Sequence, residues 1–139
     1  MSQAAETTIR NRREEFARVV RTVDRLAAEH HLAADVVKDM QVALDEVLTN
    51  IVSYGYADEA EHEIRVRLSV HDNLLEATVE DDGAPFNPLE GPVPDTRAPL
   101  RERRIGGLGM HFVKNLMSEV SYNRVGDRNR LVLRKRLAA

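Results

Sequence analysis

The sequence Arg104-Ile-Gly-Gly-Leu-Gly-Met-His-Phe112 places three glycines within four residues and continues directly into a helical pattern of apolar residues. Because Gly106, Gly107 and Gly109 lack a Cβ, their backbone N–H groups can approach an anion closely, and a helix N-terminus adds partial positive charge. We interpret the stretch as a phosphate-binding loop that opens a helix over about 108–117. Taken alone, the stretch is explained better by a flexible glycine loop before an ordinary core helix, and other parts of the chain are needed to support the phosphate-binding interpretation.

The segment before these glycines has a different composition. All five prolines lie between Pro85 and Pro99, and a charged run extends from Arg97 to Arg104. A loop of this length inside a compact domain is usually either a functional lid or disordered. We therefore expect residues 84–105 to form a lid over a ligand, with disorder in the absence of ligand as the alternative.

Two amphipathic helices are predicted in the first 54 residues, one from about Asn11 to His30–His31 and one over 34–54. Both carry an apolar stripe, and Gly55 suits the end of the second helix. Glu46 and Asn50 lie one turn apart, on the side of that helix away from its stripe. They are either its solvated face or a functional pair. Residues 1–10 are expected to be frayed, with at most a short strand over 7–10.

Two hairpins complete the pattern. Apolar residues alternate over 64–70 and 75–79 around a turn at 71–73, and the second strand runs into Glu80-Asp81-Asp82-Gly83. Further strands are predicted over 120–125 and 131–137, around a turn formed by residues 126–129. This order predicts an α+β fold, a two-layer sandwich in which a mainly antiparallel sheet of about four strands carries three helices on one face.

Composition narrows the function classes. The 139 residues suit one domain, 1–139, and the absence of cysteine excludes disulfides and thiolate chemistry. The net charge of −3 gives no reason to expect direct nucleic-acid binding or an anionic membrane surface. The short run Arg97–Arg104 is the alternative nucleic-acid patch, but Glu102 interrupts it. The N-terminus lacks the apolar run of a signal peptide and no stretch is long enough to span a bilayer, so we expect a cytoplasmic protein.

The polar residues singled out above each have a use in a nucleotide site. A carboxylate such as Asp81 can accept a hydrogen bond from an adenine amino group, and Gly83 lets the base approach the backbone. The side-chain oxygen of Asn50 is a suitable Mg²⁺ ligand. Glu46, one turn earlier, can act as a general base. A lid can exclude water and bring an arginine to the terminal phosphate.

Three of these motifs resemble the N, G1 and G2 boxes of the GHKL ATPase superfamily, which includes histidine kinases and gyrase B. They are Glu46-x-x-x-Asn50, Asp81-x-Gly83 and Gly107-x-Gly109. Residues 44–51 and 106–117 are similar to the same regions of its small branch, the anti-sigma factor serine/threonine kinases of the RsbW and SpoIIAB type. The resemblance covers about residues 12–137.

The resemblance implies the Bergerat fold, with ATP and Mg²⁺ as cofactors. It implies that Asn50 binds Mg²⁺, that Glu46 is the catalytic base, and that Asp81 and Gly83 recognise adenine. The residues that it places around the phosphates are Gly106, Gly107, Leu108 and Gly109. Arg104 is favoured over Arg101 and Arg103 as the catalytic arginine at the γ-phosphate.

One departure concerns the last strand. Family members often offer a threonine from this strand to the adenine pocket, but residues 129–133 contain none. This departure bears on how tightly adenine is recognised.

The function that the resemblance implies is partner switching. The protein would sequester a sigma factor and would phosphorylate a STAS-domain anti-sigma factor antagonist on serine or threonine. Members of this branch are usually homodimers. The alternative is a catalytically silent ATP-binding module that only sequesters a protein partner, because the same pocket serves both.

Overall fold

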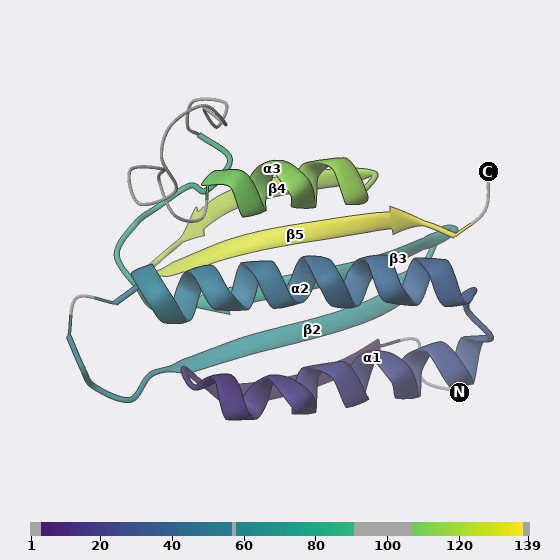
Figure 1. Cartoon of the computed structure of the whole chain (residues 1–139), viewed down its shortest axis with the longest axis horizontal. Coiled ribbons are helices and arrows are strands. Elements are labelled where there is room, and N and C mark those ends of the chain that lie inside the picture. Colours follow the sequence, from purple (N-terminus) through teal and green to yellow (C-terminus); the bar gives the residue numbers. More distant parts are fainter. Residues whose placement is uncertain (1–3, 57, 91–106, 138–139) are drawn as a thin grey trace.

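This computed structural model describes residues 4–56, 58–90 and 107–137. The described part forms two layers, with the helices on one face of a sheet (Figure 1). The elements in chain order are β1 (Ala4–Arg10), the 3-10 helix η1 (Arg13–Glu15), α1 (Phe16–His30), α2 (Ala34–Tyr54), β2 (Glu63–His71), β3 (Leu74–Asp81), α3 (Gly107–Leu116), β4 (Glu119–Val125) and β5 (Arg128–Arg136). The predicted α+β sandwich with three helices on one face is confirmed.

The sheet has the order β1-β2-β3-β5-β4, and all of its neighbouring strands are antiparallel. Alternate residues of the central strands point toward the helices, and Ile64, Leu68, Leu75 and Leu133 are each at most 1% exposed. They pack against the apolar stripes of α1 and α2 in one core. Each such side chain stabilises the fold by about 1.5–3 kcal/mol through burial.

The sheet has a fifth strand, which the sequence analysis allowed only as a short strand over 7–10. Residues 1–10 were expected to be frayed, but Ala4–Arg10 pairs with β2 over its whole length. Ile9 is 1% exposed and belongs to the core. The expectation was wrong because small and polar residues fill most of this strand. The strand is stabilised by its backbone pairing with β2 and by the buried side chain of Ile9, not by a hydrophobic pattern of its own.

The helices follow the predicted pattern. The predicted bounds of α2 are confirmed, and Gly55 N–H bonds the Ile51 carbonyl oxygen at its C-terminus. α1 begins at Phe16, a few residues later than predicted, because residues 13–15 form η1. It ends at His30, and the C-cap residue His31 has a left-handed φ of 53°.

The two hairpin turns differ in how well they were predicted. Asp72 and Asn73 have φ values of 50° and 61°, the type of turn that suits the twist of a hairpin. The turn predicted over 126–129 is shorter, because Val125 pairs with Arg128 and only two residues lie between them. Asn129 is therefore a strand residue, directly opposite Asp81 of β3.

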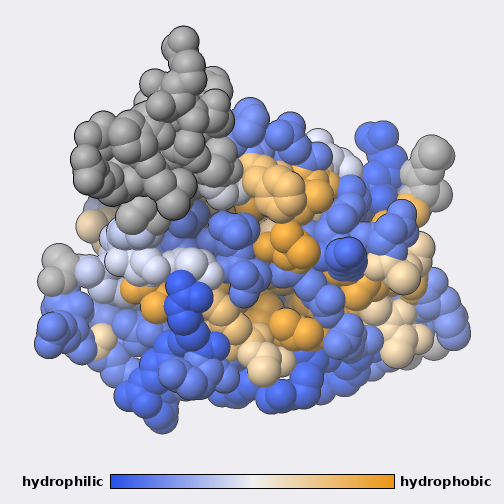
Figure 2. All heavy atoms as spheres, in the orientation of Figure 1, coloured by the Kyte–Doolittle hydropathy of each residue, from blue (hydrophilic) through white to orange (hydrophobic). Residues whose placement is uncertain are grey.

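The outer surface of the helix layer is mixed in polarity (Figure 2). A shallow groove between α1 and α2 is lined mainly by apolar side chains: Phe16, Val19, Val20, Val23, Leu44 and Leu48, with Gln41 and Asp45. In the described part of the chain, no helix is long and apolar enough to cross a membrane.

Candidate functional site

The N-terminal end of α3 meets the middle of α2. Glu46 is half-buried, and a Cβ built on Gly109 would overlap its Oε2 atom. The glycine and the carboxylate are thus in close contact, and a side chain at position 109 would displace the end of the Glu46 side chain. Asn50 follows one turn later and is also half-buried. Neither Glu46 nor Asn50 forms a side-chain hydrogen bond with another described residue, which leaves both available to a ligand.

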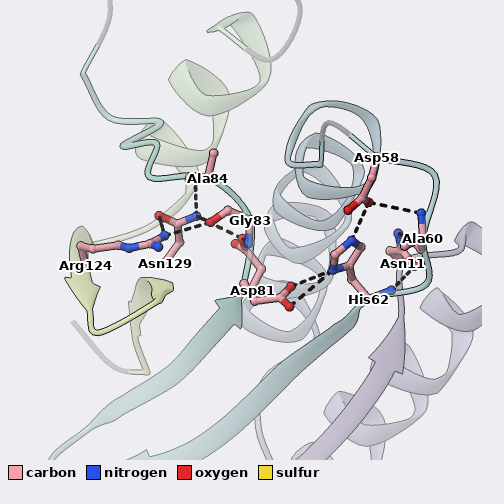
Figure 3. Close-up of polar contacts among 10 residues, drawn as sticks. Asn11, Asp58, Ala60, His62, Asp81, Gly83, Ala84, Arg124 and Asn129 are labelled. Carbon is pink, nitrogen blue, oxygen red and sulfur yellow. Dashed lines mark hydrogen bonds and ion pairs between the residues drawn. The ribbon is translucent and has the colours of Figure 1, made fainter.

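Asp81 lies at the end of β3, at a position where the strand would otherwise continue the core. Side chains of β3 alternate between the two faces of the sheet, and Ala77 and Val79 point toward the helices. Asp81 occupies the next position on this inward face and is 6% exposed. Its Oδ1 atom accepts hydrogen bonds from Gly83 N (2.9 Å) and from Asn129 Nδ2 (3.1 Å), as Figure 3 shows. Among the described residues, no hydrogen bond reaches its Oδ2 atom. A buried carboxylate is thus held with one oxygen saturated and the other free.

Gly83 packs against the end of α2. A Cβ at this position would overlap the carbonyl oxygen of Gly55 and would lie 2.9 Å from Asp81 Oδ1. The close approach requires glycine, because one of these neighbours is backbone and cannot move aside easily. Gly83 therefore brings the end of the helix that carries Asn50 to the strand end that carries Asp81.

Asn129 belongs to this site, although the sequence analysis assigned it to a turn. It is 8% exposed and continues the inward face of β5. Its Nδ2 donates to Asp81 Oδ1 and to the Ala84 carbonyl oxygen (2.9 Å), and its Oδ1 accepts from Arg124 Nη1 (3.2 Å). The signal that could have found it is the register, since a two-residue turn at 126–127 places Asn129 opposite Asp81.

A second polar cluster lies beside Asp81, in the segment that joins α2 to β2. His62 is close to two carboxylates, with Nε2 at 2.7 Å from Asp58 Oδ1 and Nδ1 at 3.2 Å from Asp82 Oδ1. The hydrogen bond to Asp58 is the main cause that raises the pKa of His62 and lowers the pKa of Asp58. The Tyr56 ring stacks on the imidazole, with centroids 4.0 Å apart. Burial, with the nearby Asp81 and Asp82 charges, raises the pKa of Tyr56.

Some predicted site residues lie outside the part of the chain described. They include Arg104, the competing Arg101 and Arg103, and Gly106, together with most of the predicted lid. Gly107 and Leu108 form the first turn of α3, as predicted. Among the described residues there is no group of three or more His, Asp or Glu side chains that could hold a metal ion. Asn50 offers one side-chain oxygen, a ligand type that suits Mg²⁺ when water and a bound molecule supply the rest of its coordination.

The arrangement fits an adenine nucleotide. The free Oδ2 of Asp81 is an acceptor for an exocyclic amino group, and Gly83 removes the side chain that would stand in the way of a base. The glycine-rich start of α3 offers backbone N–H groups to phosphates. Glu46 lies at the same helix start, where a terminal phosphate would be held.

Comparisons with known proteins show the family of the chain. A sequence model of the histidine kinase-like ATPase domain matches residues 9–135. The chain is 31% identical over 101 residues to serine-protein kinase RsbW of Listeria monocytogenes, which covers 68% of this chain and 63% of that protein. It is 31% identical over 112 residues to serine-protein kinase RsbW of Bacillus velezensis, which covers 76% of this chain and 69% of that protein. The chain thus spans a little under two thirds of the Listeria relative.

A solved structure shares the fold. The crystal structure of the RsbU and RsbW domains of a Mycobacterium tuberculosis protein matches 98% of this chain and 32% of that chain, with a TM-score of 0.68 and 17% sequence identity. At this identity the match concerns the fold alone, and the family assignment rests on the sequence comparisons. The chain belongs to the histidine kinase-like ATPase domain family, and within it the chain is a distant homologue of the RsbW serine-protein kinases.

Proposed function

We propose that this protein is an ATP-dependent serine/threonine protein kinase. The observation that carries the proposal is the contact between Glu46 and Gly109. It places a carboxylate that has no hydrogen-bond partner among the described residues at the start of the helix where phosphates would bind. A domain that only bound ATP would not need a free carboxylate at this point.

The proposed roles follow from the surroundings of each residue. Asp81 accepts a hydrogen bond from the adenine amino group, and the backbone at Gly107 and Gly109 donates to the phosphates. Glu46 takes the proton from the attacking hydroxyl of a protein substrate. Asn50, one turn from Glu46, would hold Mg²⁺ through its side-chain oxygen.

When bound, ATP and Mg²⁺ would supply the phosphoryl group and neutralise its charge. Arg104 is proposed as the contact of the lid with the terminal phosphate.

The proposed partners rest on the homology. Relatives at 31% identity are serine-protein kinases named RsbW. We therefore propose that the protein sequesters a sigma factor and phosphorylates a STAS-domain antagonist on serine or threonine, as a homodimer. Phosphorylation would release the antagonist and leave the kinase free to hold the sigma factor.

The test is phosphoryl transfer to candidate STAS-domain proteins from the same genome, followed by mass spectrometry of the candidate. Glu46→Gln is the matched control, because it keeps the size of the side chain beside Gly109 and removes the base. Transfer in the wild type that falls about 10²–10⁴-fold in Glu46→Gln supports the kinase. ATP binding without transfer to any candidate would favour the module that only sequesters a partner.

A further inference from the structure

The orientation of the Asn129 side chain is determined by its neighbours. On one side lie three acceptors: Asp81 Oδ1 (3.1 Å), the Gly83 carbonyl oxygen (3.5 Å) and the Ala84 carbonyl oxygen (2.9 Å). On the other side lie Arg124 Nη1 (3.2 Å) and Phe86 N (3.3 Å), which can only donate, and the Tyr122 hydroxyl. The NH₂ group must therefore face Asp81, and the amide cannot flip without losing bonds on both sides.

This fixed amide controls what Asp81 can offer to a ligand. Together with Gly83 N, the amide saturates Oδ1 and restrains rotation of the carboxylate, so that Oδ2 is the atom left for a base. A carboxylate in this state accepts hydrogen bonds and donates none. It can pair with the 6-amino group of adenine and repels the 6-oxo group of hypoxanthine or guanine.

The same network holds the beginning of the predicted lid. Asn129 bonds the backbone at Ala84 and Phe86, and Arg124 Nη1 donates to the Gly83 carbonyl oxygen at 2.9 Å. The first residues after β3 are thus tied to β4 and β5 through one buried side chain. The same side chain therefore contacts both the start of this segment and the Asp81 carboxylate.

We propose that Asn129 is a positioning residue that makes the site selective for a 6-amino purine over a 6-oxo purine. The inference rests on the proposed nucleotide site and adds a specificity determinant to it. Asn129 acts through Asp81, and Tyr122 and Arg124 act through Asn129. The selectivity then belongs to the network rather than to Asp81 alone.

The test compares the affinities for ADP and inosine diphosphate, measured by isothermal titration calorimetry. The two nucleotides differ at the purine 6-substituent and at N1, which is an acceptor in adenine and an N–H donor in hypoxanthine, so their affinity ratio reports recognition of this edge of the base. The wild type should bind ADP about 10- to 100-fold more tightly, the range expected for one charged hydrogen bond gained or lost. Asn129→Leu, which has the same branching but no polar atoms, should lower this ratio about tenfold. Asn123→Leu, an exposed position of the neighbouring strand, is the matched control and should keep the ratio.

A purely structural role for Asn129 gives a different result. Asn129→Leu would then weaken both nucleotides equally, with an unchanged ratio, and the inference would be overturned. If this variant does not fold, Tyr122→Phe removes only one hydroxyl from the network and should still lower the ratio by a few-fold, whereas an unchanged ratio overturns the inference. Failure of the wild type to bind ADP would instead refute the nucleotide site itself and the inference with it.

Discussion

Replacing Gly109 by alanine should separate catalysis from stability. The new Cβ would overlap Glu46 Oε2, which is the far end of a flexible side chain, so Glu46 can rotate away. Displacing a side chain from its preferred rotamer costs about 0.5–1.5 kcal/mol. Replacing a helical glycine by alanine stabilises the helix by up to about 1 kcal/mol through helix propensity. The free energy of unfolding should therefore change by less than about 1 kcal/mol, while the displaced base lowers phosphoryl transfer by about 10²-fold or more.

Two further variants make this prediction specific. In a Glu46→Ala background the overlap is absent, so Gly109→Ala should then stabilise the protein by up to about 1 kcal/mol through helix propensity alone. Gly126→Ala is the control away from the site, because its φ of 60° makes any side chain strained although nothing lies within 4 Å. It should lower stability by about 1 kcal/mol and leave transfer unchanged.

The measurements are urea unfolding for stability and transfer of labelled phosphate from ATP to the substrate for activity. The reasoning fails if Gly109→Ala transfers phosphate at the wild-type rate. It also fails if the variant loses more than about 3 kcal/mol of stability in both backgrounds, because the clash would then lie with the backbone rather than with Glu46.

Three other predictions concern the fold around the site. Gly83→Ala should cost about 1–3 kcal/mol of unfolding free energy, because its Cβ meets the backbone oxygen of Gly55; urea unfolding with no loss would contradict that contact. Ile9→Ala should cost about 2–5 kcal/mol in the same assay if β1 is part of the core, whereas a frayed segment would tolerate it. The raised pKa of His62 stabilises the fold fully below its ordinary value of 6.5, and this stabilisation is lost as the pH rises through the raised value. The lowered pKa of Asp58 contributes stability above pH 3.8 that is lost as the pH falls through the lowered value. His62→Asn should therefore flatten the fall in stability as the pH rises above 6.5, and an unchanged slope would show that the pair does not matter.

Much of the fold follows from hydrophobic periodicity. The stripes of α1 and α2 and the alternation in β2 and β3 were strong enough to predict these elements without knowledge of their partners. β1 was expected at most as a short strand over 7–10, because Ala4-Ala5-Glu6-Thr7-Thr8 has no such alternation and forms a strand by pairing with the edge of β2. A signal of this kind comes from tertiary pairing and is absent from the local sequence.

The site was predicted unevenly for a similar reason. Glu46, Asp81 and the glycines stand in recognisable spacings, and the structure places Gly109 against Glu46. Asn129 was missed because Gly126-Asp127-Arg128-Asn129 consists largely of residues that favour turns, so the sequence does not say where the turn ends. Only the pairing of β5 with β3 shows that Asn129 faces Asp81. Residues 129–133 contain no threonine, a departure from the family, and the first of them, Asn129, donates its amide to Asp81 Oδ1.

The most direct test of the nucleotide site is a titration of ¹⁵N-labelled protein with ADP, followed by NMR. The account predicts one saturable site, with the largest shifts at the backbone amides of Gly83, Gly107 and Gly109 and at the side-chain amide of Asn129. In Asp81→Ala these shifts should require a much higher ADP concentration. Shifts confined to the outer face of the sheet, or the same affinity in Asp81→Ala as in the wild type, would contradict the central claim that Asp81 and the start of α3 bind one nucleotide between them.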